Sequence, residues 1–169
     1  MKIDLELEGM DELEEQLRGA IEGLLPSAAK GLEKGLARVE TQAKDTCPRK
    51  TGQLRESIHF EVEQNGDGVT GTVGSAKEYS VYVEMGTGDV GRASGGNGSP
   101  VKVSYREGGW FVPLEAGKDK YIADTLVEEK SPGFWTRGQP ARPYLWPAWK
   151  ANKQKVIADI QSAVKKGLR

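Results

Sequence analysis

The chain has 169 residues, enough for one modest hydrophobic core, and we treat residues 1–169 as a single domain. Its 37% hydrophobic and 29% charged residues argue against a disordered or fibrous protein, and no apolar run approaches the ~20 residues of a membrane helix. The acidic start MKIDLELEGMDELEEQ lacks the apolar core of a signal peptide, and the single Cys47 cannot form an internal disulfide, so we expect a reducing cytoplasm and no membrane partner.

The net charge of −1 is unevenly distributed along the chain. Residues 1–40 carry ten acids against five bases, whereas residues 137–169 carry eight bases against Asp159 alone. An acidic N-terminal region and a basic C-terminal region favour contact between subunits or packing of one end of the chain on the other. Two helices with solvated charged faces would give the same charge pattern. Nucleic-acid binding by the basic tail is a weaker interpretation, because the nearby aromatic residues lie among prolines rather than between the basic ones.

Two helices are expected near the N-terminus, after a short strand-like segment at Leu5 and Leu7. The first has apolar residues at three- and four-residue steps: Met10, Leu13, Leu17, Ile21 and Leu24. We expect Pro26 to interrupt it and Ser27 to cap a second helix, whose apolar stripe is Ala29, Leu32, Leu36, Val39 and Ala43. This second helix must end before Pro48. Its two glycines, Gly31 and Gly35, weaken it, so it should depend on tertiary packing.

A β-hairpin is expected next. Residues 57–64, SIHFEVEQ, alternate apolar and polar side chains as in a half-buried strand, the turn 65–68 reads Asn-Gly-Asp-Gly, and VTGTV returns as the partner strand. The segment YSVYVEM at 79–85 fits either a strand or a helical turn closed by Gly86, and we favour the helical turn slightly.

The remaining elements follow a glycine-rich segment. Residues 86–100 contain six glycines and are expected to form a mobile loop. VKVSY and WFVPL predict a second hairpin at 101–114, with Pro113 marking an edge strand. Residues 115–138 are expected to be largely irregular. A final helix is expected from about Pro147 to Gly167.

The sequence offers little catalytic chemistry. Gly86, Gly88 and Gly91 have the G-x-G-x-x-G spacing of a dinucleotide-binding turn, but no buried strand–turn–helix unit surrounds them, so we expect no cofactor. His59 is the only histidine, which leaves too few ligands for a zinc or copper site. Cys47 has no sequence-local base and is expected to be inert. We therefore predict neither catalytic nor metal-binding residues.

Three separated motifs resemble one family. CPRKTGQLRESI (47–58) is similar to a Pro-x-x-Thr-Gly-x-Leu-Arg-x-Ser-Ile signature, YSVYVEMGTG (79–88) to a Tyr-Ala-x-Tyr-Val-Glu-Phe-Gly-Thr element, and ARPYLWPAW (141–149) to a Pro-Phe-Leu-x-Pro-Ala run. These motifs resemble the tail-component, or neck, family of long-tailed bacteriophages related to Hong Kong 97, whose members occur in virions and prophages. The agreement in order and approximate spacing extends from about residue 9 to 165.

The resemblance implies an α+β structural protein, with N-terminal helices and a long C-terminal helix packed on a small antiparallel sheet. It implies no enzymatic activity and a ring-like homo-oligomer at the head–tail junction. The motif residues are then scaffold residues: Pro48, Thr51, Gly52, Leu54, Arg55, Tyr79, Tyr82, Glu84, Gly86, Thr87, Arg142, Pro143, Tyr144 and Pro147. Met85 and Tyr144 depart mildly from the pattern. The stretch of about 88–139 is longer than usual and would be an insertion carrying the second hairpin.

Physical roles can be assigned to several motif residues. Thr51 could cap a short turn toward Leu54, and Glu84 could accept a charge-assisted bond from Arg55 or Arg142. Pro143 and Pro147 preset the entry to the final helix, where Pro147 in the first turn removes no intrahelical bond.

We expect a phage or prophage structural protein in the bacterial cytoplasm and in the neck or tail of the virion. It would act in head–tail joining or tail completion through self-association and contacts with other neck and tail proteins. The expected interfaces are the 86–100 loop, the 101–114 hairpin and the terminal helices, with Tyr105, Trp110 and Trp135 as candidates, although tryptophans are as often core residues. One alternative is a nucleic-acid-contacting module whose basic tail meets DNA passing through a ring, and another is an enzyme or nucleotide binder at the glycine-rich loop.

Overall fold

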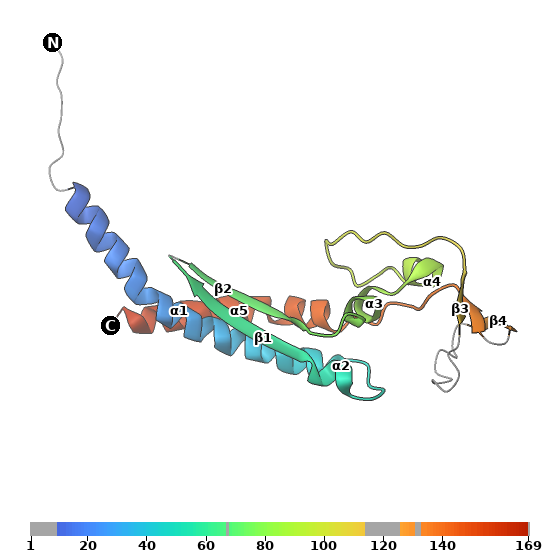
Figure 1. Ribbon diagram of the computed structural model, residues 1–169. Coiled ribbons are helices and arrows are strands. Elements are labelled where there is room, and N and C mark those ends of the chain that lie inside the picture. Colours follow the sequence, from blue (N-terminus) through green and yellow to red (C-terminus); the bar gives the residue numbers. More distant parts are fainter. Residues whose placement is uncertain (1–9, 67, 114–125, 131–132, 169) are drawn as a thin grey trace, which may run out of the picture. The chain divides into compact units, whose positions relative to one another are not determined.

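The computed structural model describes residues 10–66, 68–113, 126–130 and 133–168 (Figure 1). Over these residues the elements are, in chain order, α1 (Met10–Thr46), α2 (Gln53–Glu56), β1 (Ile58–Asn65), β2 (Gly68–Ser75), α3 (Ser80–Met85), α4 (Gly88–Ala93), β3 (Trp110–Pro113), β4 (Leu126–Lys130), β5 (Gly133–Thr136) and α5 (Leu145–Gly167). The predicted α+β class is confirmed. The strand-like segment at Leu5 and Leu7 lies outside the described residues.

The chain divides into two compact units, which we describe separately. Unit 1 comprises Met1–Arg38, Phe60–Val73 and Asn152–Arg169, and unit 2 comprises Val39–His59 and Gly74–Ala151. The helices α1 and α5 and the β1–β2 hairpin each contribute residues to both units.

Unit 1 is built on a close approach of α1 and α5. A Cβ atom added to Gly31 would lie 2.6 Å from Cα of Ile160, and one added to Gly35 would lie 3.0 Å from Cα of Val156. The two glycines that weaken α1 as an isolated helix therefore permit its backbone to contact α5, which explains why this helix depends on tertiary packing. A Cβ on Gly71 of β2 would likewise meet Leu32 and Leu36, so α1 also packs against the hairpin.

The prediction of two N-terminal helices is wrong, because α1 continues through Pro26. Proline removes one intrahelical hydrogen bond and crowds the preceding turn, at a cost of about 3 kcal/mol. Leu25 is buried beside it, and the packing at Gly31, Gly35 and Leu36 begins within two to three turns. We attribute the continuity of the helix to this burial, which opposes the local cost of proline. The predicted end before Pro48 is confirmed, since α1 ends at Thr46.

The first hairpin is confirmed, with β1 and β2 forming a two-stranded sheet. At its base in unit 2, the hydroxyl groups of Ser57 and Ser75 lie 2.7 Å apart, and Ala76 N donates to the carbonyl of Ser57. Ile58 is fully buried in unit 2, whereas the strand residues that follow it along β1 are half-buried or exposed.

The predicted hairpin at 101–114 is wrong. β3 pairs instead with β5 in a three-stranded antiparallel sheet of order β3-β5-β4, with Phe111 opposite Trp135 and Val112 opposite Phe134. Residues 101–109 form no strand because their polar groups bind elsewhere: Tyr105 donates to the carbonyl of Met85 at 2.9 Å, and Gly108 N donates to Asp89. The strands β4 and β5 also correct the prediction that 115–138 is largely irregular. The edge position of Pro113 is confirmed.

The segment 86–100 is not wholly a loop, because Gly88–Ala93 forms the short helix α4. Asp89 in its first turn pairs with Arg92 at 2.6 Å, and Arg92 also reaches Glu107 at 2.9 Å. These ion pairs and the surrounding backbone contacts oppose the low helix propensity of the two glycines within α4.

Candidate scaffold and assembly surface

The helix α3 presents two different faces in unit 2. The predicted helical turn at 79–85 is confirmed, and Gly86 ends it with φ of 76°. Glu84 is buried, with 7% of its surface exposed, whereas Tyr82 on the same helix is 55% exposed. The inner face of α3 therefore carries a charge and its outer face carries an aromatic ring, which is the reverse of an ordinary amphipathic helix.

The buried charge of Glu84 caps the N-terminus of α5. Its Oε2 atom accepts the backbone N–H groups of Tyr144 at 2.8 Å and Leu145 at 3.0 Å, and its Oε1 atom accepts that of Trp146 at 2.9 Å. The next helical residue is Pro147, which has no N–H to satisfy. A single carboxylate thus accepts hydrogen bonds from the first N–H groups of the helix, which have no acceptor within the helix, and it lies at the positive end of the helix dipole.

These partners differ from the predicted arginine. The fourth hydrogen bond to Glu84 comes from the side-chain amide of Asn97 at 3.0 Å, and Arg55 donates instead to the carbonyl of Lys44 at 3.1 Å, near Asp45. Arg142 meets the same region through its backbone, since its N–H donates to the carbonyl of Val83 at 2.8 Å. The sequence singled out Glu84 but gave no sign that its partners would be main-chain groups or Asn97.

Tyr144 and Cys47 lie buried in the same unit. Burial raises the pKa of Tyr144 to about 12, with smaller contributions from Cys47 and the negative charge of Glu84. Burial likewise raises the pKa of the Cys47 thiol, partly offset by the positive charge of Arg55. Because the thiolate is the nucleophilic form, a raised pKa makes Cys47 a poorer nucleophile than an exposed thiol.

The glycine turn that follows α3 is filled by its own chain. A Cβ on Gly86 would lie 2.7 Å from the backbone nitrogen of Ala141, and one on Gly88, at φ of 59°, would overlap the carbonyl oxygen of Arg137. The N–H groups of Thr87 and Val90 donate to the carbonyls of Gln139 and Arg137, and that of Gly91 donates to Thr87. These amides are therefore not available to hold a phosphate, which argues against a nucleotide at the G-x-G-x-x-G spacing.

The predicted capping role of Thr51 is wrong. Gly52 occupies the N-cap position of α2 with φ of 84°, and no side chain caps this helix. Gly52 is suited to that position because it has no Cβ to strain. Leu54 is buried and anchors α2 to unit 2.

The three candidate interface residues lie in different environments. Tyr105 is half-buried and hydrogen-bonded to Met85, and Trp110 is half-buried with the guanidinium of Arg106 5.5 Å from its ring centroid. Trp135 is 42% exposed and packs edge-on against Phe111, with ring centroids 6.3 Å apart. Phe111 was not singled out from the sequence, although its position opposite Trp135 in the register puts both rings on one face of the sheet.

The exposed large apolar residues that the structure describes in unit 2 form three sets. One is the outer face of α3 with the preceding Tyr79, a second is the Phe111–Trp135 pair, and the third is Val101 and Val103. In the described ranges the structure contains no group of three or more His, Cys, Asp or Glu side chains arranged to hold a metal ion. None of the helices in those ranges has the length and apolar character needed to cross a bilayer.

Comparison with known proteins supports the motif resemblance. No curated protein and no solved structure matches the chain. The motif at 47–58 and the first eight residues of the motif at 79–88 lie within the range matched by a family model, whereas the third motif at 141–149 lies outside it. Residues 11–86 match the family described as "Bacteriophage HK97-gp10, putative tail-component", the family that the motifs had indicated.

Proposed function

We propose that the chain is a structural component of a phage or prophage tail, acting at the head–tail junction or in tail completion. The observation that carries this proposal is the match of residues 11–86 to the HK97 gp10 tail-component family. The mechanism is assembly: the protein associates with further copies of itself, in a ring, and with other neck and tail proteins.

The exposed aromatic residues of unit 2 support assembly as the mechanism. Aromatic side chains are enriched in protein interfaces, and Tyr82 and Trp135 leave large apolar areas in water. Burying such a side chain on association contributes roughly 1.5–3 kcal/mol before the costs of ordering. We therefore assign the outer face of α3 and the Phe111–Trp135 pair to contacts with other subunits.

The candidate chemical groups support a role without catalysis. The carboxylate of Glu84 is occupied by four hydrogen bonds, and the glycine turn is filled by backbone. We propose that these groups serve to hold α3, the glycine turn and the start of α5 together, so that the exposed side of α3 is rigid.

The proposal is tested by measuring the mass of the purified full chain by light scattering, alone and with the other neck and tail proteins of the same phage. We expect oligomers, seen as rings by electron microscopy, and a shift to smaller species for Tyr82→Ser and Trp135→Ser. Glu63→Ser, on the exposed side of β1, is the matched control and should assemble normally. A chain that stays monomeric under all these conditions and binds none of those proteins contradicts the proposal.

A further inference from the structure

Near the start of α1, residue 15 and residues 18–23 are exposed within the described part of unit 1. We call residues 10–24 the arm. A Cβ added to Gly19 or Gly23 would meet nothing within 4 Å, and Ile21 is 50% exposed. In contrast, Gly167 at the end of α5 packs on Ser27 and lies near Leu24, so α5 ends where the arm ends. Figure 1 shows the first turns of α1 extending beyond the end of α5.

The sequence of the arm is typical of an amphipathic helix whose apolar face packs against another surface. Leu13, Leu17, Ile21 and Leu24 recur at three- and four-residue steps, so they share one face of the helix. A helix of this length is marginal in water without tertiary contacts. The arm is also acidic, with five acids, Asp11, Glu12, Glu14, Glu15 and Glu22, against Arg18.

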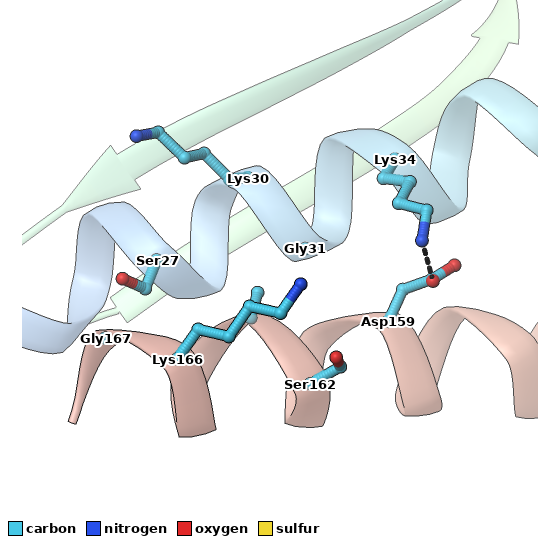
Figure 2. A pocket seen from close by; sticks show the side chains of 9 residues that line it. Ser27, Lys30, Gly31, Lys34, Asp159, Ser162, Lys166 and Gly167 are labelled. Atoms are coloured by element: carbon cyan, nitrogen blue, oxygen red, sulfur yellow. Dashed lines mark ion pairs between the residues drawn. The ribbon is translucent and has the colours of Figure 1, made fainter. Parts of the chain in front are cut away.

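Unit 1 contains a groove of matching size and charge between α1 and α5. It has a volume of about 400 Å³, and its lining includes the small residues Ser27, Gly31, Ser162, Ala163 and Gly167 (Figure 2). Lining residues 159–167 of α5 span roughly 12 Å along the helix, which corresponds to about two turns of a partner helix. The stretch of the arm from Leu17 to Leu24 spans roughly 10 Å along the helix, which is close to that length.

The rim of the groove is positively charged. Its one acid, Asp159, is bound by Lys34 at 2.8 Å and by Arg38 at 2.7 Å, and these hydrogen bonds lower the pKa of its carboxyl group. Figure 2 shows the side chain of Lys166 reaching across the groove toward α1. Lys165 is exposed beside it in the last turn of α5. The groove thus presents a net positive charge to an incoming acidic helix.

We propose that the arm of one copy docks in this α1–α5 groove of a second copy. The arm cannot enter its own groove, because α1 is continuous from Met10 to Thr46 and the groove begins at Ser27, one turn after the arm ends. The contact joins two different surfaces, so it is head-to-tail and generates a ring or a filament according to the rotation between copies. This inference rests on the proposed self-assembly and names the surfaces that carry it.

Paired charge reversals test the contact. The arm variant is Glu15→Lys with Glu22→Lys, and the groove variant is Lys165→Glu with Lys166→Glu. Each alone should weaken self-association by at least about tenfold, because like charges then face each other across the contact. Mixing the two variants should restore assembly, since the reversed arm fits the reversed groove and the native arm fits the native groove. The control Lys150→Glu with Lys153→Glu makes the same charge change on α5 outside the groove lining and should assemble normally.

A second variant tests the groove by shape. Ser162 is exposed and lines the groove, so Ser162→Trp should fill it while leaving the melting temperature unchanged and should dissociate the assembly. If the wild-type chain assembles and neither the reversals nor Ser162→Trp affects it, the docking proposal is wrong while self-assembly stands. If the groove reversal abolishes binding of duplex DNA and leaves assembly intact, the basic surface serves nucleic acid instead. A wild-type chain that stays monomeric contradicts the docking proposal, and it contradicts the proposed function as well if the chain also binds none of the other neck and tail proteins.

Discussion

At the scale of single residues, Glu84 shows why a buried charge can be structural. Its carboxylate sits among four N–H donors, three of them from the backbone at the start of α5. Burying a carboxylate is costly unless it is fully hydrogen-bonded, and here the helix dipole adds to the compensation. The residue therefore joins α3 to α5 within unit 2 without requiring a cationic side chain.

Replacing Glu84 should destabilise the protein strongly. Glu84→Ala leaves backbone donors of Tyr144, Leu145 and Trp146 without their acceptor, and we expect a loss of about 2–3 kcal/mol in the free energy of unfolding. Glu61→Ala, on the exposed side of β1, should change it by less than about 0.5 kcal/mol. Urea denaturation followed by circular dichroism measures both, and equal losses in the two variants would refute the capping role.

The packing of the glycine turn predicts that Gly91 cannot be replaced freely. A mobile loop at 86–100 would tolerate Gly91→Ala, but the added Cβ would lie 2.6 Å from the carbonyl carbon of Gly86. We therefore expect a loss of more than about 1 kcal/mol in the free energy of unfolding, as for Gly86→Ala. Gly74→Ala is the control, because nothing lies within 4 Å of its Cβ and its φ is not positive. Chemical denaturation that ranks Gly91→Ala with Gly74→Ala would contradict this account.

The raised pKa of Tyr144 predicts that the stability of the protein falls at alkaline pH. Its pKa is about 12 in the folded protein and about 10 when unfolded, so the folded state retains the proton more tightly. The resulting stabilisation is complete below about pH 10 and is lost as the pH rises toward 12, at up to about 1.4 kcal/mol per pH unit. Tyr144→Phe removes the titrating group, so its unfolding free energy should fall less steeply over that range. Parallel profiles for the two proteins would exclude this origin.

At the scale of elements, the sequence correctly predicted the helices and strands that have a strong local sequence signal. The C-terminal helix, the β1–β2 hairpin and the turn at α3 follow from apolar spacing, the Asn-Gly-Asp-Gly turn and the position of Gly86. The errors have non-local causes. Pro26 stays within a helix that packs closely on α5 from Ser27 onward, and β3 pairs with β5 because residues 101–109 bind Met85 and Asp89. Such partners lie far away in sequence and leave no local signal.

The glycines of α1 should respond in opposite directions to the same substitution. Gly31→Ala places a methyl group 2.6 Å from Cα of Ile160 and should destabilise the protein by about 1–3 kcal/mol. Gly23→Ala meets nothing within 4 Å and should be neutral or stabilising by up to about 1 kcal/mol through helix propensity. Thermal unfolding of both variants tests the close approach of α1 and α5. If both substitutions stabilise the protein, the close approach at Gly31 is contradicted.

At the scale of the whole molecule, two sets of surfaces serve one proposed purpose. Unit 1 carries the arm and the positively charged groove, and unit 2 carries the exposed aromatic residues, of which Tyr82 lies on the helix that Glu84 joins to α5. The uneven charge of the chain suggested subunit contact, but the groove became visible only once Gly31, Ala163 and Gly167 were brought together. The family match spans residues from both units and covers less than half of the chain.

The most direct test of the account is sedimentation velocity of the wild-type chain over a range of protein and salt concentrations. We predict oligomers at micromolar concentration that dissociate as salt rises, because salt screens attraction between the acidic arm and the basic groove. A chain that sediments as a monomer at every protein and salt concentration would contradict self-assembly as the basis of its function.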